Sequence, residues 1–176
     1  AKALPDRIPA ASQGTMNNVA MGHIDDETGR RWDYYETLAG GIGGGPTTAG
    51  RDAVHSHMTN TLNTPIESLE MHYPLRVHRY AVRRDSGGKG KHDGGAGVVR
   101  EYEFLEQAQL SLLSERREIA PWGLNEGGEG MRGRNSLNGK TLPGKCSITV
   151  ETGDRLLIET PGGGAWGKPA TLKNSD

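Results

Sequence analysis

The sequence GGIGGGPTTAGRDAVHSHMTNTLNTPIESLE, residues 40–70, brings a glycine-rich run, two histidines and a cluster of amide and carboxylate side chains into one short stretch. Glycines can adopt backbone conformations with φ > 0, and a glycine run can present its amide N–H groups to a ligand. We therefore expect Gly43 and Gly44 to let a carbonyl or anionic substrate approach the backbone closely. A flexible turn remains the alternative, because no Lys-Ser or Lys-Thr pair follows at the spacing of a phosphate-binding loop.

His55 and His57 are the most specific chemical signal in the chain. If this segment is extended, side chains two residues apart point to the same face, and the two imidazoles converge as metal ligands or as an acid–base pair. If the segment is helical, the two side chains diverge and the pairing carries no meaning. We expect at least one of the two histidines to have a functional role, with hydrogen-bonded structural histidines as the alternative.

A helix start is predicted directly after the histidines. Thr64, Pro65 and Glu67 stand at the N-cap, the first and the third helical positions, an arrangement that stabilises the first turn of a helix. This assignment gives Glu67 a structural task as a capping-box residue.

The composition describes a chain with a small hydrophobic core. Of 176 residues, 27 are glycine and only 33% are hydrophobic, so we expect a partner or a further domain to contribute to stability. The 21 basic and 22 acidic residues nearly balance and form no long run of one sign, which argues against nucleic acid or an anionic membrane as the partner. The arginine pairs at 83–84 and 116–117 are predicted to be solvated strand ends.

The single cysteine, Cys146, leaves no internal disulfide and suits a reducing compartment. It lies in a strand-like run, and nothing around it indicates activation as a nucleophile. No apolar stretch is long enough to span a membrane, and the start of the chain lacks the pattern of a signal peptide. We expect a soluble, cytoplasmic protein.

Short alternating segments separated by glycine-rich runs predict the fold class. We expect a mainly β (α+β) fold with minor helix, an antiparallel sandwich or distorted barrel with long glycine-rich loops. Residues 1–169 are predicted to form a single domain, and residues 170–176 a disordered polar tail. The expected hairpins pair 19–23 with 31–38, 98–106 with 109–116, and 146–150 with 155–159.

Three polar features are less specific. Asn17 and Asn18 are either turn residues or part of a pocket lining. His78 lies on the polar face of an alternating strand and is predicted to be exposed. Residues 85–97 are about half glycine but interleave Asp, Ser, Lys and His, and we interpret them as a shaped loop, since a flexible linker rarely carries so many chemical groups.

A set of motifs distributed in order along nearly the whole chain resembles the C-terminal part of the hydantoinase B/oxoprolinase family. The motifs are QGTMNN (13–18), YET (35–37) with the glycine run at 40–45, HSHMTNT (55–61), NTPIE (63–67), DSGG (85–88), PWGL (121–124) and TPGGG (160–164).

The resemblance implies a division of labour in an ATP-dependent hydrolase of a cyclic amide: hydantoin, N-methylhydantoin, 5-oxoproline or a lactam. An A-type subunit would bind ATP and Mg²⁺ and phosphorylate the amide oxygen, and the B-type part would complete ring opening. Ketone carboxylases of the acetone or acetophenone type are related and give the alternative function. The chain would then be a fragment or split subunit that needs the A-type subunit and the N-terminal part of the B-type subunit.

Two departures from the family pattern bear on this interpretation. The chain is much shorter than a usual B-type subunit, and the N-terminal acidic and histidine motifs that the family associates with a divalent metal are absent. The closing glycine run continues as Ala-Trp-Gly-Lys-Pro at 165–169, where the family more often has Tyr-Gly-Asp-Pro. We therefore expect the isolated chain to be inactive.

The resemblance also assigns the candidate site residues. His57 would transfer a proton to the leaving nitrogen, and Asn60 and Asn63 would hold substrate oxygens. The predicted catalytic residues are His55, His57 and Glu67, and the predicted substrate-binding residues are Asn17, Asn18, Asn60, Asn63, Gly43 and Gly44. No metal-ligating residue is assigned in this chain.

Two other interpretations stay open. A cupin-like metal enzyme would use His55, His57 and Glu67 as ligands, but Glu67 follows His57 by ten residues where a cupin has only a few. A structural module that organises a larger assembly without reactive groups also fits the low hydrophobic content and the glycine-rich runs.

Overall fold

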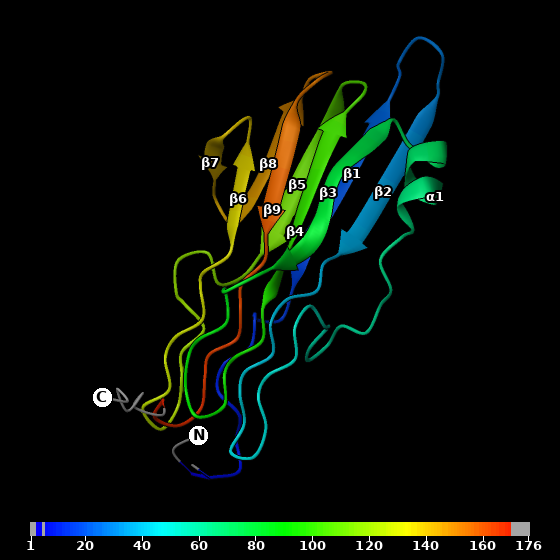
Figure 1. Ribbon diagram of the computed structural model, residues 1–176. Helices are drawn as coiled ribbons and strands as arrows, with labels where there is room; N and C mark the ends of the chain where they lie inside the picture. The colour runs from blue at the N-terminus through cyan, green and yellow to red at the C-terminus, as the bar shows by residue number, and fades with distance from the viewer. Residues whose placement is uncertain (1–2, 5, 170–176) are drawn as a thin grey trace, which may run out of the picture.

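The computed structural model describes residues 3–4 and 6–169, so the polar tail predicted at 170–176 lies outside the described residues. The described part contains nine strands and one short helix (Figure 1). They are β1 (Asn17–Ile24), β2 (Arg31–Thr37), α1 (Ile66–His72), β3 (Leu75–Arg83), β4 (Gly97–Phe104), β5 (Ala108–Ser114), β6 (Arg134–Leu137), β7 (Lys140–Leu142), β8 (Lys145–Val150) and β9 (Arg155–Glu159).

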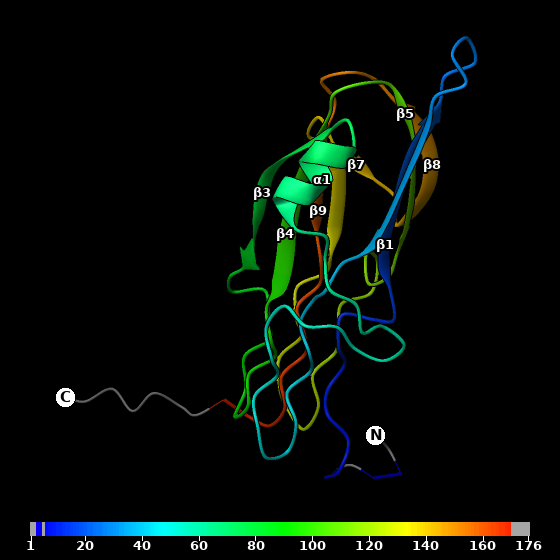
Figure 2. The same ribbon diagram turned by 90° about the vertical axis from the view of Figure 1, so that its right-hand side faces the viewer.

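The strands form two antiparallel sheets. One has the order β2-β1-β5-β8 and the other the order β3-β4-β9-β6-β7. The two sheets form separate layers (Figure 2), and one cluster of buried side chains joins them, including Leu110 of β5 and Phe104 of β4. The predicted mainly β class is therefore confirmed in its sandwich form, and the described strands do not close into a barrel.

Alternation in β5 shows how the sequence builds this core. Ala108, Leu110 and Leu112 are buried, and the residues between them are exposed. Since alternate side chains of a strand point to opposite faces, one face of β5 packs into the sandwich while the other meets solvent. The predicted exposure of His78 on β3 is confirmed, but His78 lies at a bulge between Val77 and Arg79, where the alternation of β3 is interrupted.

Of the three predicted hairpins, the hairpin of β1 and β2 is confirmed. At the other two places the chain crosses from one sheet to the other. The predicted pairing of 98–106 with 109–116 is wrong, because β4 pairs with β3 and β9 while β5 pairs with β1 and β8. The predicted hairpin of 146–150 with 155–159 is wrong for the same reason. A strand with one apolar face can pack across the core as well as pair with its neighbour in sequence, so alternation does not distinguish the two arrangements.

The hairpin of β6 and β7 lies at the end of a glycine-rich run and is not among the predicted ones. Asn138 and Gly139 form its two-residue turn, with φ of 49° and 79°. An Asn-Gly pair favours this turn because both residues tolerate positive φ.

Helix α1 starts later than predicted. Pro65 occupies the N-cap with φ −54°, and no side chain caps the first turn. The amide of Thr64 instead donates to Oε1 of Glu36 in β2 at 3.0 Å, and Glu67 is exposed. The capping box predicted for Thr64 and Glu67 is therefore wrong, because strand β2 already engages residue 64.

Beyond one end of the sheets, the glycine-rich segments run side by side as a bundle of extended chains (Figure 1). Backbone hydrogen bonds join them: Gly163 N–H donates to Gly95 O, and Gly95 N–H donates to Ile42 O, both at 2.8 Å. The shaped loop predicted at 85–97 is part of this bundle. We call the following segments the glycine bundle: residues 9–14, 40–45, 50–54, 86–97, 121–130 and 160–167.

Glycine is needed in the bundle because neighbouring backbones touch. A Cβ at Gly43 would overlap the carbonyl oxygen of Ala10, and a Cβ at Gly163 would overlap that of Ile42. Backbone atoms held by hydrogen bonds on both sides cannot move away as the end of a long side chain can. Gly45 differs, since a Cβ there would meet its nearest neighbour at 3.8 Å, an ordinary contact.

We expect Gly43→Ala to destabilise the protein and Gly45→Ala to be tolerated. Overpacking typically costs about 1–3 kcal/mol, and the backbone at Ala10 leaves little room for relaxation. Neither glycine has positive φ, so the two variants differ in packing space and not in backbone strain. Thermal unfolding of both variants beside the wild type tests this, and an equal shift of the midpoint in both would contradict it.

Candidate functional site

The candidate site lies where the sheets meet the glycine bundle. Residues 53–65 leave the bundle and lead into α1 (Figure 1). This segment is not a continuous strand, because His57 has a left-handed backbone with φ 54° within a turn. The extended geometry in which His55 and His57 would face one point is therefore not formed, and the two imidazoles have different neighbours.

His57 lies at the edge of a groove of about 590 Å³. Its Nε2 atom is 2.7 Å from Oγ of Ser12, and the residue is otherwise exposed. An imidazole that is oriented by a hydroxyl group and open to solvent can take up and return a proton. The apolar lining of the groove is formed by Ile8, Pro9, Ala10, Ala11, Ile42 and Trp122.

Arg116 and Trp122 close the same groove. The guanidinium carbon of Arg116 lies 4.3 Å from the ring centre of Trp122, in a cation–π contact. The backbone of Arg116, like that of His57, is left-handed, with φ 56°. Such conformations cost energy in residues with side chains and are concentrated at functional sites. We therefore take the groove beside His57 as the candidate active site.

His55 faces a buried ionic cluster instead. Neither ring nitrogen of His55 has a hydrogen-bond partner among the described residues. Burial lowers the pKa of His55, and the negative charge of Glu36 opposes this shift only in part. The fold therefore favours the neutral imidazole at this position.

Glu36 and Arg100 form the centre of this cluster. Arg100 is fully buried, and its Nη2 atom lies 3.7 Å from Oε2 of Glu36. Tyr102 donates its hydroxyl hydrogen to Oε2 of Glu36 at 2.6 Å and accepts one from Nε of Arg100 at 3.2 Å. Desolvation lowers the pKa of Arg100, but Tyr102 and Glu36 together raise it by more. The carboxylate and the phenol thus keep the buried guanidinium charged.

Glu36 also fastens the histidine segment to the first sheet. Its Oε1 atom accepts the Thr64 amide hydrogen at 3.0 Å. Asn63 donates to Thr37 O at 3.1 Å, and the Thr37 hydroxyl donates to Oδ1 of Asn18 at 2.9 Å. The predicted site residues Asn18 and Asn63 are therefore brought together, but their bonds anchor residues 53–65.

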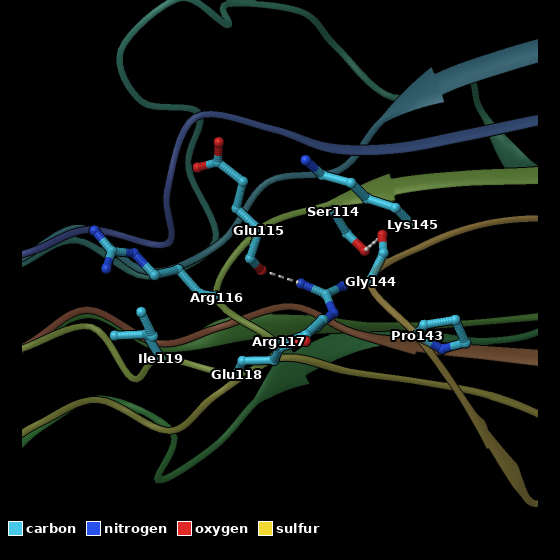
Figure 3. Close-up of a pocket in the computed structure, with 9 residues that line it drawn as sticks. All are labelled: Ser114, Glu115, Arg116, Arg117, Glu118, Ile119, Pro143, Gly144 and Lys145. Atoms are coloured by element: carbon cyan, nitrogen blue, oxygen red, sulfur yellow. Dashed lines mark hydrogen bonds between the residues drawn. The ribbon is translucent and has the colours of Figure 1, made fainter.

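Asn17 belongs to a second polar group, around Arg117, whose own side chain is drawn in Figure 3. Nη1 of Arg117 donates to Oδ1 of Asn17 at 2.6 Å, and Nη2 donates to Oδ1 of Asn135 at 2.7 Å. Asn17 donates to Oε1 of Gln13 at 2.8 Å, and Gln13 donates to Val54 O at 3.4 Å, next to the histidine motif. Arg117 is therefore not the solvated strand end that the sequence predicts.

The remaining predicted residues lie apart from these contacts. Asn60 and Glu67 are exposed. Gly44 donates its amide hydrogen to Gly164 O at 2.8 Å, and Gly43 lines the groove beside His57 without positive φ. The glycine run therefore forms bundle and groove wall rather than a cradle of free amides.

The described residues do not provide a set of ligands for a metal, and the glycine run at 40–45 does not form a phosphate-binding loop. Among residues 3–4 and 6–169, no three His, Cys, Asp or Glu side chains are grouped so that they could hold a metal ion. The amides of Gly44 and Gly45 are bonded to carbonyl oxygens of the protein, which leaves no anion nest at this run. The cupin-like interpretation, which needs both histidines and Glu67 around one ion, is therefore wrong.

Sequence reasoning missed the charged groups buried at the site. Alternation places Arg100 on the same inward face as Val98 and Tyr102, so a charged residue at an inward position was the available signal. Glu36 is likewise a charged residue at an inward position of a strand, in β2. Arg117 lies beyond the end of β5, where no periodic pattern marks the inward side.

The same fold occurs within solved enzyme structures. The ATP-dependent caprolactamase from Pseudomonas jessenii superposes with a TM-score of 0.77 at 25% identity, over 95% of this chain and 31% of that chain. An acetone carboxylase in its nucleotide-free form superposes with a TM-score of 0.68 at 16% identity, over 96% and 28%, a likeness of fold alone. The sandwich with its glycine bundle is therefore a recurring part of larger enzymes.

The family model for hydantoinase B/oxoprolinase matches residues 1–169. The chain belongs to this family, as its motifs predict. It is 49% identical to 5-oxoprolinase 1 of Arabidopsis thaliana, over 90% of this chain and 12% of the relative. It is 34% identical to the B-type subunit of a putative D-/L-hydantoinase of a Pseudomonas species, over 96% of this chain and 30% of the relative. The chain thus spans well under half the length of these relatives.

In the part of the chain that the structure describes, no helix is long and apolar enough to cross a membrane.

We expect Glu36→Gln to lower the free energy of unfolding by about 3 kcal/mol, because it leaves the charge of Arg100 buried without its partner. Asp33→Asn is the matched control, since Asp33 pairs with Arg31 at the exposed surface and the change should leave stability unchanged. Urea denaturation of the two variants measures the difference. Equal stability of Glu36→Gln and the wild type would contradict the role of the buried pair.

The lowered pKa of His55 gives stability a pH dependence. In the unfolded chain histidine titrates at about pH 6.5, and the folded protein takes up this proton less readily. The contribution is therefore complete above that pH and is lost as pH falls below it. We expect the wild type to lose more free energy of unfolding between pH 8 and pH 5.5 than His55→Gln does. Equal losses in urea denaturation at the two pH values would show that His55 has no part in this dependence.

Proposed function

We propose that this chain forms part of the B-type component of an ATP-dependent cyclic-amide hydrolase, where its groove helps to process the activated ring. Support comes from the family membership of residues 1–169 and from the caprolactamase and 5-oxoprolinase relatives. The observation that carries the proposal is the His57–Ser12 pair, 2.7 Å apart, at the mouth of an apolar groove of about 590 Å³. Such a groove suits a small ring with few polar groups.

In this proposal His57 protonates the leaving nitrogen of the opening ring. The form of His57 that acts as the acid is the imidazolium, in which Nε2–H donates to Oγ of Ser12 and Nδ1–H faces the substrate. Transfer of the Nδ1 proton to the leaving nitrogen leaves a neutral imidazole, and the Ser12 hydroxyl keeps the ring oriented during this step. Asn60, exposed on the same segment, is the residue we assign to hold a substrate oxygen. His55, Asn18 and Asn63 position this segment from inside.

We assign ATP and Mg²⁺ to an A-type partner subunit, and any divalent metal to an N-terminal part of the B-type component. Among the described residues no three His, Cys, Asp or Glu side chains are grouped to hold a metal ion, and the glycine run at 40–45 does not form a phosphate-binding loop. The Pseudomonas relative is named as one subunit of a hydantoinase, which supports a partner of this kind. The isolated chain should then have no activity, and we place the assembly in the cytoplasm, in keeping with the single Cys146.

A ketone carboxylase is the second candidate function, supported by the fold shared with acetone carboxylase. The hydrolase is preferred, because the relatives with 49% and 34% identity are named as 5-oxoprolinase and hydantoinase. Incorporation of labelled bicarbonate into a ketone by the assembled enzyme, in place of ring opening, would reverse this preference.

We expect His57→Ala in the assembled enzyme to lower kcat for ring opening by about 10²–10⁴-fold, the usual contribution of a general acid. Ser12→Ala should lower kcat less, because the imidazole is then present but not oriented. His72→Ala, exposed on α1, is the control and should leave turnover unchanged. Product formation from a cyclic amide with ATP and Mg²⁺ measures all three.

Full turnover in His57→Ala, with the enzyme still assembled, would overturn the assignment. The chain would then be the structural module that its glycine bundle also suits.

A further inference from the structure

Arg117 carries a charge that the described contacts do not neutralise. Its hydrogen bonds go to the side-chain oxygens of Asn17 and Asn135 and to the carbonyl oxygen of Glu115, all of them neutral acceptors. Figure 3 shows its guanidinium amid the residues that line one pocket, while the side chain of Arg116 points away from it. Arg117 is half-buried, and a charge withdrawn from water without an opposite charge is costly unless something else supplies one.

The charged group that affects the pKa of Arg117 is another arginine. Burial lowers the pKa of Arg117, and the positive charge of Arg83 lowers it further. A guanidinium group keeps its proton in proteins, so Arg117 stays positively charged in this unfavourable environment. A bound anion would therefore stabilise the charge of Arg117, which its present neighbours do not neutralise.

A second pocket, of about 590 Å³ and with a different lining from the pocket in Figure 3, also borders this guanidinium. It is lined by Arg83, Arg117, Arg132 and Arg134, with Glu118 as the one carboxylate in its wall. A second carboxylate, Glu159, is not among the lining residues but pairs with both Arg83 and Arg134. Four guanidinium groups thus face two carboxylates, and positive charge is left over. Arg83 was predicted to be a solvated strand end, but it is half-buried and held by this ion pair.

The members of this pocket come from separate parts of the chain. Arg83 ends β3, Arg117 follows β5, Arg132 precedes β6, and Arg134 begins β6. Convergence of distant arginines on one hollow differs from a run of charges on one exposed face. Arg132 is exposed, so a ligand can reach it without opening the fold.

We propose that the pocket of Arg83, Arg117, Arg132 and Arg134 binds a phosphate-type oxyanion, either inorganic phosphate or the phosphoryl group of a small molecule. Guanidinium groups match tetrahedral oxyanions because each can donate two parallel hydrogen bonds. One Nη2 hydrogen of Arg117 remains after its bonds to the two asparagines, and Arg132 supplies a full fork. This site is distinct from the groove beside His57, and it goes beyond the proposed hydrolase function.

A tetrahedral anion fits the pocket better than a carboxylate from a protein segment. A carboxylate lies in one plane and pairs with one guanidinium fork, whereas phosphate oxygens point in several directions and engage several forks at once. The hydroxyl of Thr141 in the pocket wall is a further donor of the kind that phosphate accepts.

Titration of the full chain with sodium phosphate, against sodium chloride at equal ionic strength, tests the proposal. We expect a saturable rise in the unfolding midpoint with phosphate and none with chloride beyond the effect of ionic strength. Arg132→Gln should weaken phosphate binding at least fivefold without changing the stability of the free protein, since Arg132 is exposed. Arg76→Gln, an exposed change near the start of β3, is the control and should bind as the wild type does.

A second titration with glycerol 3-phosphate separates the two sources of the anion. Binding at least as tight as that of inorganic phosphate points to a phosphorylated small molecule, and binding of inorganic phosphate alone points to the free ion. Equal phosphate effects in the wild type and Arg132→Gln, or no effect in either, would overturn the proposal. Weaker association of Arg132→Gln with a partner subunit, without any phosphate binding, would also overturn it in favour of an acidic protein segment.

Discussion

Backbone-to-backbone contact between glycine segments is the constraint on which the rest of this structure depends. The bundle has no side-chain core of its own, and its chains approach so closely that the carbonyl oxygens of Ala10 and Ile42 occupy the space where Cβ atoms at Gly43 and Gly163 would lie. Backbone hydrogen bonds replace apolar packing as the link between neighbours. The unusual glycine content is therefore a packing requirement and not a sign of flexible linkers.

The bundle fixes where the chemistry can be. It carries Ser12 and Ile42 to one wall of the groove and releases residues 53–65 at the level where the sheets begin. The buried pair of Glu36 and Arg100 then holds that segment from the sheet side. His57 is thus positioned between a rigid backbone array and a buried ionic cluster, which is how a left-handed backbone can be maintained there.

The sequence predicted the class of the fold and much of its local structure, but not how the strands are assembled. Alternation located β5 because side-chain direction is a local property, whereas His78 is exposed at a bulge that interrupts the alternation of β3. Strand partners across 105–107 and 151–154 depend on which sheet the chain enters, and turn residues do not encode that choice. The failure at Thr64 has the same origin, because its amide is bonded to a residue in a distant strand.

The candidate site was predictable in part. The histidine motif lies at the groove that we take as the candidate site, and Asn17, Asn18 and Asn63 hydrogen-bond to polar partners near it. Their partners could not be read from the sequence, since Arg100 and Arg117 are charged residues whose burial is decided by tertiary contacts. Apart from the inward alternation at Arg100, charged side chains in strands and loops look alike in a sequence whether they are solvated or buried.

The glycine bundle also determines how this protein responds to temperature. The heat capacity increment of unfolding comes from newly hydrated apolar surface and is reduced by newly hydrated peptide groups. A region held by amide–carbonyl contacts releases mainly peptide groups when it unfolds, so it adds little to this increment. The stability curve of the protein is consequently flatter than that of a chain of equal length with an ordinary hydrophobic core, and its stability changes less between cold and warm conditions.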